Sequence, residues 1–296
     1  MLKRDSSKKI LFILSIWVIG FAAIFTLNNL KKTQAKQSDS VVMTTYALTQ
    51  VADTLHMDLA GIPNTQYPIP KRYKNTDKVG APNAPSMEKI KKLNPDTVYS
   101  VTTLRSMQGK SYKANKINVT YLNLQTVDHL KTTLNTLAKR YDKQVYADKF
   151  INKLDRNILK VKQKNKNNDS KKVLVLFGMP GGGYLQATTN SYIGSLVKDT
   201  NNIVIQPKNS QGEYISVNME QIQKEKPEVV ICLAHAMPEM VEKSFKEEFS
   251  SNQMWQELPA FQNKRVYYLR EPVYSSTANM NVIKALNGID KIVNEK

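Results

Sequence analysis

Apolar residues recur at alternating spacings of four and three between residues 143 and 166 of the chain. This spacing places apolar side chains on one face of an α-helix, and neither Pro nor Gly interrupts the segment. At about 1.5 Å rise per residue, the helix would be roughly 35 Å long. We therefore expect a backbone helix that runs along two domains. Its apolar positions are Ala147, Ile151, Leu154, Ile158 and Val161.

The segment before this helix is repeated after it, 132 positions later. Residues 86–101 align with residues 218–233, and Glu220 falls on Glu88. In both copies a helical stretch ends at a Pro and an apolar, β-branched run follows. Pro fixes its own φ and disfavours helical backbone in the residue before it. The repeat predicts two related α/β halves with a ligand cleft between them.

These patterns predict an α/β fold with two Rossmann-like lobes joined by one long backbone helix. At 296 residues the chain is long enough for two domains, each with its own core. We expect a membrane anchor or signal with its tether at residues 1–40. An N-terminal α/β lobe would span residues 41–140, the connecting helix 141–168 and a C-terminal α/β lobe 169–296.

A run of eighteen uncharged residues, Ile10–Leu27, lies near the amino terminus with lysines on both sides. Roughly 17–25 apolar residues cross a bilayer, whereas a cleaved signal peptide has an apolar region of about 7–15 residues. We therefore favour an uncleaved membrane anchor, with secretion after signal cleavage as the alternative. The basic residues before the run would stay in the cytoplasm, which places the rest of the chain on the extracellular face of the cell membrane.

The chain carries 43 Lys and Arg against 25 Asp and Glu, a formal net charge of +18. This balance favours an anionic neighbour such as phospholipid headgroups, cell-wall polymers or an acidic ligand. No nucleic-acid motif accompanies the charge, so we do not expect nucleic acid as a partner. Because the lysines are spread along the chain, a solvated basic surface is the simpler interpretation. The single cysteine, Cys232, lies in a predicted buried strand. It can neither form an intramolecular disulfide nor carry a lipid near the amino terminus.

Among the three histidines, His235 has the most informative position. It follows the apolar run Val229–Leu233, just past the carboxyl end of a predicted strand, where α/β sheets present side chains to ligands. From this position a His can bind a metal, act as a base or hydrogen-bond a carbonyl. The chain has no Gly-x-Ser-x-Gly elbow and no His-Glu-x-x-His pair, so we expect no enzymatic activity. A haem needs only one or two side chains and a broad apolar slot.

Six sequence blocks, in order, resemble the IsdE-like haem-binding lipoproteins, which are substrate-binding components of haem ABC transporters in Gram-positive bacteria. That group lies within the helical-backbone class of substrate-binding proteins, which also binds siderophores and cobalamin. The resemblance covers residues 41–296. The blocks are Thr44–Thr49, Pro70–Lys74, Val79–Pro82, Thr188–Gly194, Leu233–Glu239 and Thr277–Asn279.

The resemblance implies an extracytoplasmic receptor that captures haem b as a transported ligand between its lobes and delivers it to an ABC permease. It places an axial ligand of the haem iron at His235. The further haem contacts that it implies are Tyr46, Ala47, Thr65 and Gln66.

The second axial ligand is less clear, because the family's Met falls on Asn83, whose neutral amide is a poor iron ligand. Five-coordinate iron is one alternative. Met87, one helical turn away, and the phenolate of Tyr46 are the others.

The resemblance also implies partners. In this class a surface Glu on each lobe meets Arg residues of the permease, and we assign these roles to Glu88 and Glu248. Cell-wall haem-relay proteins would supply the ligand, and the protein would act as a monomer. A siderophore or cobalamin receptor of the same fold is the alternative function. A cell-wall-associated enzyme and a basic adhesion module are more distant ones.

Overall fold

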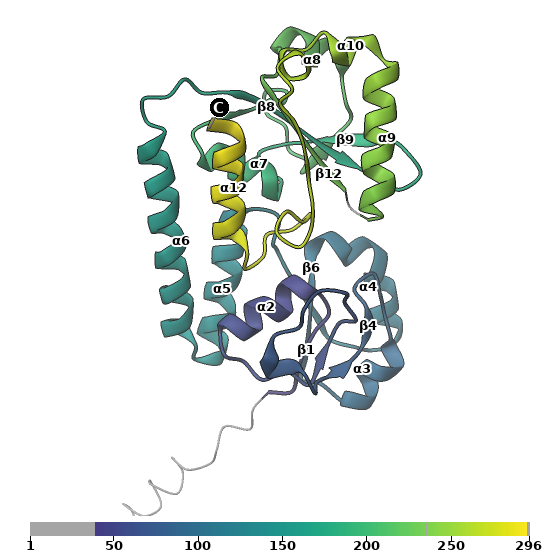
Figure 1. Cartoon of the computed structure of the whole chain (residues 1–296). Helices are drawn as coiled ribbons and strands as arrows, with labels where there is room; N and C mark the ends of the chain where they lie inside the picture. Colours follow the sequence, from purple (N-terminus) through teal and green to yellow (C-terminus); the bar gives the residue numbers. More distant parts are fainter. Residues whose placement is uncertain (1–38, 235, 295–296) are drawn as a thin grey trace, which may run out of the picture. The chain divides into compact units, whose positions relative to one another are not determined.

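The structure is a computed structural model that describes residues 39–234 and 236–294 (Figure 1). Residues from Ser40 onward belong to one compact unit. The predicted anchor and His235 lie outside the described residues. No helix within residues 39–234 and 236–294 is both long enough and apolar enough to cross a membrane.

The first lobe is built on a five-stranded parallel sheet with the order β3-β2-β1-β6-β7. Alternate residues of its strands point to opposite faces. Val41 and Tyr99 join the helices α2 and α5, whereas Val42 and Val98 pack with α3 and α4 on the other face. The elements are β1 (Val41–Met43), α2 (Tyr46–Thr54), β2 (Gly61–Ile62), η1 (Lys71–Tyr73), β3 (Asp77–Lys78), β4 (Gly80–Ala81), β5 (Ala84–Pro85), α3 (Met87–Leu93), β6 (Thr97–Val101), η2 (Thr102–Leu104), α4 (Arg105–Ala114), β7 (Val119–Leu122) and α5 (Val127–Tyr141).

The second lobe has the same arrangement, a sheet with helices on both faces. Its strand order is β11-β9-β8-β12-β13, and β10 also pairs with β8. Here β9 runs antiparallel to β8, as a hairpin across the Gly-rich loop 178–184. Cys232 is buried between this sheet and α9, as predicted. The elements are β8 (Lys172–Gly178), β9 (Tyr184–Ala187), α7 (Tyr192–Asp199), β10 (Ile203–Val204), β11 (Tyr214–Ile215), α8 (Met219–Glu225), β12 (Val229–Ala234), α9 (Pro238–Ser251), α10 (Gln253–Gln256), α11 (Pro259–Gln262), β13 (Val266–Leu269) and α12 (Val282–Asn294).

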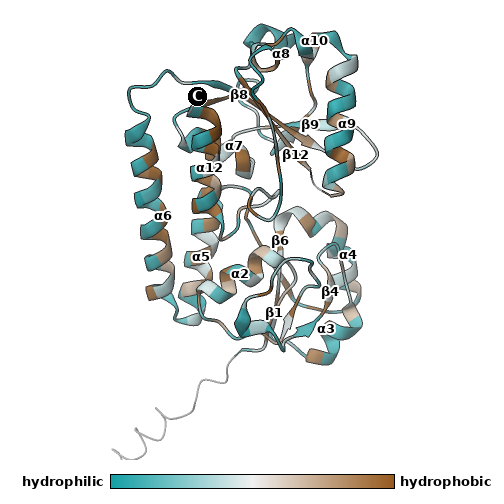
Figure 2. Ribbon diagram, in the orientation of Figure 1, coloured by the Kyte–Doolittle hydropathy of each residue, from teal (hydrophilic) through white to brown (hydrophobic). Residues whose placement is uncertain are grey.

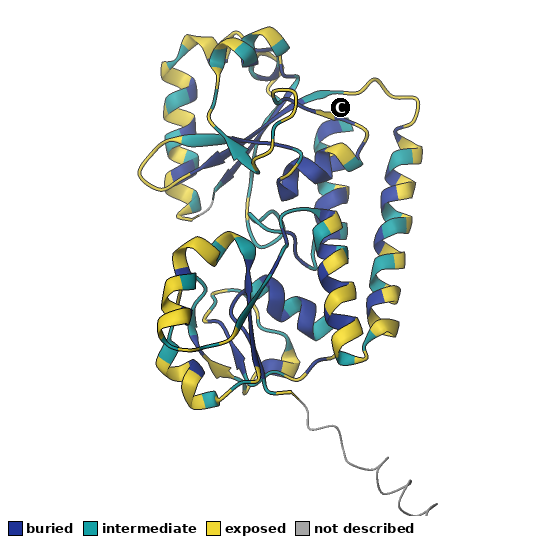
Figure 3. Cartoon of the chain, turned by 180° about the vertical axis from the view of Figure 1, so that it is seen from behind, coloured by how far each residue is buried: buried dark blue, intermediate teal, exposed yellow. Residues whose placement is uncertain are grey.

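The long backbone helix is α6 (Gln144–Lys164), close to its predicted bounds. Four of its five predicted apolar positions are buried, and Ile151 is partly buried against the same core. Figure 2 shows the apolar residues on one side of the helix, and Figure 3 shows that the opposite side is exposed.

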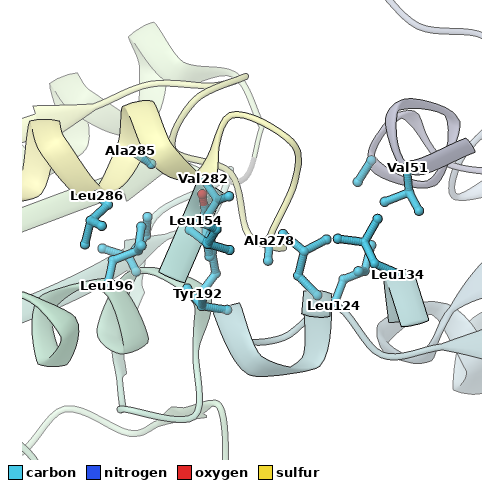
Figure 4. Close-up of a cluster of buried hydrophobic side chains, with 14 of the residues drawn as sticks. Val51, Leu124, Leu134, Leu154, Tyr192, Leu196, Ala278, Val282, Ala285 and Leu286 are labelled. Atoms are coloured by element: carbon cyan, nitrogen blue, oxygen red, sulfur yellow. The ribbon is translucent and has the colours of Figure 1, made fainter. Parts of the chain in front are cut away.

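The expectation of a separate core for each lobe is wrong. One hydrophobic cluster continues from α2 and α5 through α6 to α7 and α12, so that Val51 and Leu286 belong to the same core (Figure 4). The reason is that α6 packs against α2 and α5 of the first lobe and against α7 and α12 of the second, so that the helices between the two sheets form one layer. Each outer face has a smaller cluster of its own.

The internal repeat is present in the structure. Helices α3 and α8 begin after side-chain N-caps, Ser86 and Asn218, and each ends at a residue with left-handed backbone, Asn94 and Lys226. The strands that follow them, β6 and β12, lie in the interior of their sheets. Equivalent positions in the two lobes can therefore be compared directly.

Candidate ligand-binding site

Tyr46 and Ala47, both predicted ligand contacts, form the first turn of α2. The helix begins there because the side chain of Thr45 accepts a hydrogen bond from the backbone N–H of Leu48. Ala47 is buried against the core, whereas Tyr46 is only partly buried. The Tyr46 hydroxyl donates to the carbonyl oxygen of Pro68 at 3.3 Å, which ties the helix to the loop after β2. The site is therefore built from two adjacent connections of the first sheet.

Thr65 and Gln66, the next two predicted contacts, lie in that loop and surround Tyr67. The Thr65 hydroxyl oxygen accepts from the backbone N–H of Tyr67 at 3.1 Å, and the Gln66 amide donates to the Tyr67 hydroxyl at 3.4 Å. The Tyr67 ring lies 5.2 Å from the Tyr46 ring, centroid to centroid. The structure thus gathers three of the five predicted haem-contact residues, Tyr46, Thr65 and Gln66, around a tyrosine that the sequence analysis missed.

Tyr67 also connects this loop to the other end of the chain. Its hydroxyl donates to a carboxylate oxygen of Glu271, which follows β13, 204 positions later. The pKa of Tyr67 is raised to about 12, mainly because the hydroxyl is partly buried and also because it contacts the Glu271 carboxylate. The phenol is therefore neutral and remains a donor at physiological pH. No sequence signal pairs these residues, because the contact exists only in the folded chain.

Asn83 lies in a hairpin that contacts the loop after β2, and Met87 follows this hairpin in the chain. Asn83 is exposed in the two-residue turn of the hairpin β4–β5, and the backbone N–H of Asn64 donates to the carbonyl oxygen of Gly80 in the same hairpin at 2.8 Å. Met87 opens α3 and packs against the outer cluster of the first lobe. Coordination of iron by Met87 would therefore require it to leave this cluster.

In the second lobe, β12 ends at Ala234 and α9 begins at Pro238, so His235 falls in the connection between them. Arg270, which follows β13, forms ion pairs of 2.7 Å with Glu239 and Glu242 in the first two turns of α9. Within residues 39–234 and 236–294, no three His, Cys, Asp or Glu side chains gather as a metal site.

The two predicted permease contacts differ in their surroundings. Glu88 is exposed in the first turn of α3. One carboxylate oxygen of Glu248, in contrast, accepts hydrogen bonds of 3.2 Å from Tyr184, Asn252 and Trp255. These bonds give Glu248 an internal structural role.

Glu220 occupies the position in α8 that Glu88 occupies in α3, in the first turn of the helix. The internal repeat of the sequence aligns these two residues, so it identifies Glu220 as the second-lobe equivalent of Glu88. By position, Glu220 is a better match to Glu88 than Glu248 is.

A cavity of about 320 Å³ lies between the Gly-rich loop and α9. Met179, Tyr184, Phe245 and Glu248 are among its lining residues. None of the predicted haem-contact residues lines it. The cavity is thus a feature of the second lobe alone.

Comparisons with known proteins identify close relatives. A model of the periplasmic binding protein family matches residues 41–273. The high-affinity heme uptake system protein IsdE of Staphylococcus aureus is 33% identical over 286 residues, which cover 94% of this chain and 96% of that protein.

Solved structures agree. An ABC transporter substrate-binding protein from Listeria monocytogenes EGD-e superposes with a TM-score of 0.83 at 32% identity, covering 88% of this chain and 100% of that chain. The structure of Staphylococcus aureus IsdE complexed with heme superposes with a TM-score of 0.82 at 31% identity. The match covers 87% of this chain and 99% of that chain. These matches confirm the family resemblance and the fold class predicted from the sequence.

Proposed function

The chain belongs to the periplasmic binding protein family, and we propose that it is an extracytoplasmic haem receptor that delivers haem to an ABC permease. The observation that carries this proposal is the similarity to IsdE, which extends over nearly the whole of both chains. The clustering of Tyr46, Thr65 and Gln66 on adjacent connections of one sheet supports it. The protein would bind and release its ligand without changing it.

In this proposal the aromatic and apolar groups contact the porphyrin, and polar groups of the loop after β2 receive its carboxylates. Burial of apolar surface contributes roughly 25 cal/mol per Å² before ordering costs, so a large flat ligand gains most of its affinity there. His235 would hold the iron. The net charge of +18 favours an anionic ligand.

An absorption titration of residues 40–296 with haemin tests the proposal. We expect saturable one-to-one binding with a sharpened Soret band, which His235→Ala abolishes or shifts. His56→Asn is the matched control, because His56 has a φ of 52°, a left-handed backbone that Asn tolerates. If wild type and His235→Ala give the same weak, unsaturable spectra, the haem assignment is wrong. Saturable binding of a ferric hydroxamate would then favour a siderophore receptor.

The second axial position is tested by Asn83→Met. The exposed turn at Asn83 accepts a longer side chain without disturbing the core. If Asn83 occupies the position of the family's Met, the variant should shift the bound haem toward six-coordinate, low-spin iron. An unchanged spectrum would leave Met87, Tyr46 and five-coordinate iron as the alternatives. Met87→Leu and Tyr46→Phe distinguish them, because only loss of a true ligand changes the spectrum.

We also propose that Glu88 and Glu220 form the permease contacts. The double variant Glu88→Ala/Glu220→Ala should bind haemin like wild type yet fail to stimulate ATP hydrolysis by the reconstituted transporter. Glu247→Ala is the control, since Glu247 is an exposed glutamate outside this pair. Full stimulation by the double variant would refute the assignment.

A further inference from the structure

The outer helices of the first lobe carry a concentration of lysine that the fold does not use. Helices α3 and α4 pack on the same face of the first sheet through Ile90 and Tyr112. Figure 3 shows exposed residues along their outer side. We name this surface the basic face and define it by six exposed lysines, Lys89, Lys91, Lys92, Lys110, Lys113 and Lys116.

The charges of the basic face are not neutralised by ion pairs with the described residues. None of the ion pairs in the described part of the chain involves any of the six lysines. In the second lobe, by contrast, Lys172 pairs with Glu225 at 2.8 Å and Lys246 pairs with Glu242 at 2.7 Å. The first lobe therefore presents free positive charge where the second presents internal pairs.

The internal repeat shows that this charge is not needed to build the helices. Residues 87–116 contain seven cations and two carboxylates, whereas the equivalent residues 219–248 contain four cations and seven carboxylates. The second copy has Gln221 and Gln223 where the first has Lys89 and Lys91. Both copies form a helix, a strand and a second helix, and the first helix of each has a side-chain N-cap and ends at a residue with left-handed backbone. The basic face therefore has a cause other than folding.

The chain enters the folded unit beside this face. The backbone N–H of Ser40 donates to the carboxylate of Asp96 at 2.7 Å, and the N–H of Asp96 donates to the carbonyl oxygen of Ser40 at 2.8 Å. Asp96 lies three residues after the last residue of α3, so Lys91 and Lys92 lie close in sequence to this junction. The thirteen residues from Asn28 to Ser40 span at most about 45 Å when fully extended. An anchor at Ile10–Leu27 would thus hold this end of the first lobe near the bilayer.

We propose that the basic face binds an anionic phospholipid surface. Lysines near such a surface strengthen binding by about fivefold each, and the attraction decays within a Debye length of about 10 Å at 0.1 M salt. Met107, which is 66% exposed on α4, adds an apolar side chain that can enter the headgroup layer. The face would orient the tethered receptor on its membrane. This inference does not require that the ligand be haem.

Sedimentation of residues 40–296 with vesicles tests the proposal, because this unit contains the complete described core. Vesicles of phosphatidylglycerol and phosphatidylcholine should bind the protein at 50 mM salt and release it at 500 mM, whereas pure phosphatidylcholine should not bind it. The variant Lys89→Gln/Lys91→Gln/Lys113→Gln should bind the anionic vesicles about 100-fold more weakly. Two of its substitutions copy residues of the second repeat, so the fold should tolerate them.

The control variant removes the same charge elsewhere. Lys149→Gln/Lys153→Gln/Lys160→Gln changes three exposed lysines of α6 and should weaken binding less than threefold. Equal losses in the two variants would show a general charge effect and overturn the proposal. So would equal binding to both lipids, or binding to soluble polyphosphate without binding to vesicles. A haemin titration of each variant tests haem binding independently of lipid binding, because either property can be lost while the other remains.

Discussion

The contact between Tyr67 and Glu271 should stabilise the fold by linking the candidate ligand loop to the segment after β13. Both side chains are partly buried, and the acceptor is a carboxylate. Hydrogen bonds to charged groups contribute about 1.5–3 kcal/mol to stability. Because both side chains are in contact with solvent, we expect a value at the lower end of this range. We therefore expect Tyr67→Phe to lower the free energy of unfolding by about 1.5 kcal/mol. In a double-mutant cycle with Glu271→Ala, the coupling energy should be about 1 kcal/mol.

Urea unfolding of residues 40–296 measures this effect. Trp255 is buried and is the one tryptophan in that range, so its fluorescence reports unfolding of the second lobe. Tyr121→Phe is the matched control, because the buried Tyr121 hydroxyl has no hydrogen-bond partner within the described residues. A coupling energy below about 0.3 kcal/mol, or an equal loss in Tyr121→Phe, would refute the reasoning.

The pH dependence of the coupling follows from the pKa of Tyr67. Because this pKa is raised from 10.0 to about 12, the folded state binds more protons than the unfolded state between these values. Stability from the contact is therefore complete below pH 10 and is lost as the pH rises through about 12. The coupling energy should be the same at pH 7 and pH 9. A fall between these two values would contradict the assigned donor.

Two further substitutions test the packing around the shared core. Asp290 accepts hydrogen bonds from Asn165 at 2.6 Å and other donors; burial opposes its ionisation, yet these bonds hold its pKa below 3.8. In urea unfolding at pH 7, Asp290→Asn should lower the free energy of unfolding by about 2 kcal/mol. The loss should become smaller as the pH falls through the pKa of Asp290 in the folded state, so an equal loss at pH 3 would contradict this role. Gly194→Ala places a Cβ in steric overlap with the carbonyl oxygen of Thr188 and should cost about 3 kcal/mol. In the same assay Gly109→Ala, whose Cβ meets nothing nearer than 3.8 Å, should be neutral or stabilising.

Local patterns in the sequence predicted much of the fold. The spacing of apolar residues located α6 to within two residues at each end, because one buried face requires that period. The repeat predicted the matching pairs α3–β6 and α8–β12, because helix caps and Pro turns are short-range features. The shared core was not predicted. Amphipathic periodicity marks which face of a helix is buried, but it does not say which sheet, or how many, will cover that face.

The candidate site was predicted in part for a similar reason. Tyr46, Thr65 and Gln66 were predicted from the family resemblance, and the structure places them together. Tyr67 was missed because its role depends on Glu271, and no local rule joins residues 204 positions apart. The choice of Glu248 rested on its place in the chain. Its three hydrogen bonds come from Tyr184, Asn252 and Trp255, and only the folded lobe brings the first of these to the helix.

The shared core has a consequence for how the lobes can move. Leu134 of α5, Leu154 of α6 and Leu286 of α12 are each fully buried in one cluster that contacts both sheets (Figure 4). A large rotation of one lobe against the other would expose such side chains, at about 1.5–3 kcal/mol for each one brought into water. Ligand capture is therefore easier to achieve by movement of loops at the carboxyl ends of the strands, such as residues 64–68, than by separation of the lobes. The link between Tyr67 and Glu271 lies among these loops, which is why its loss should be felt at the ligand site as well as in stability.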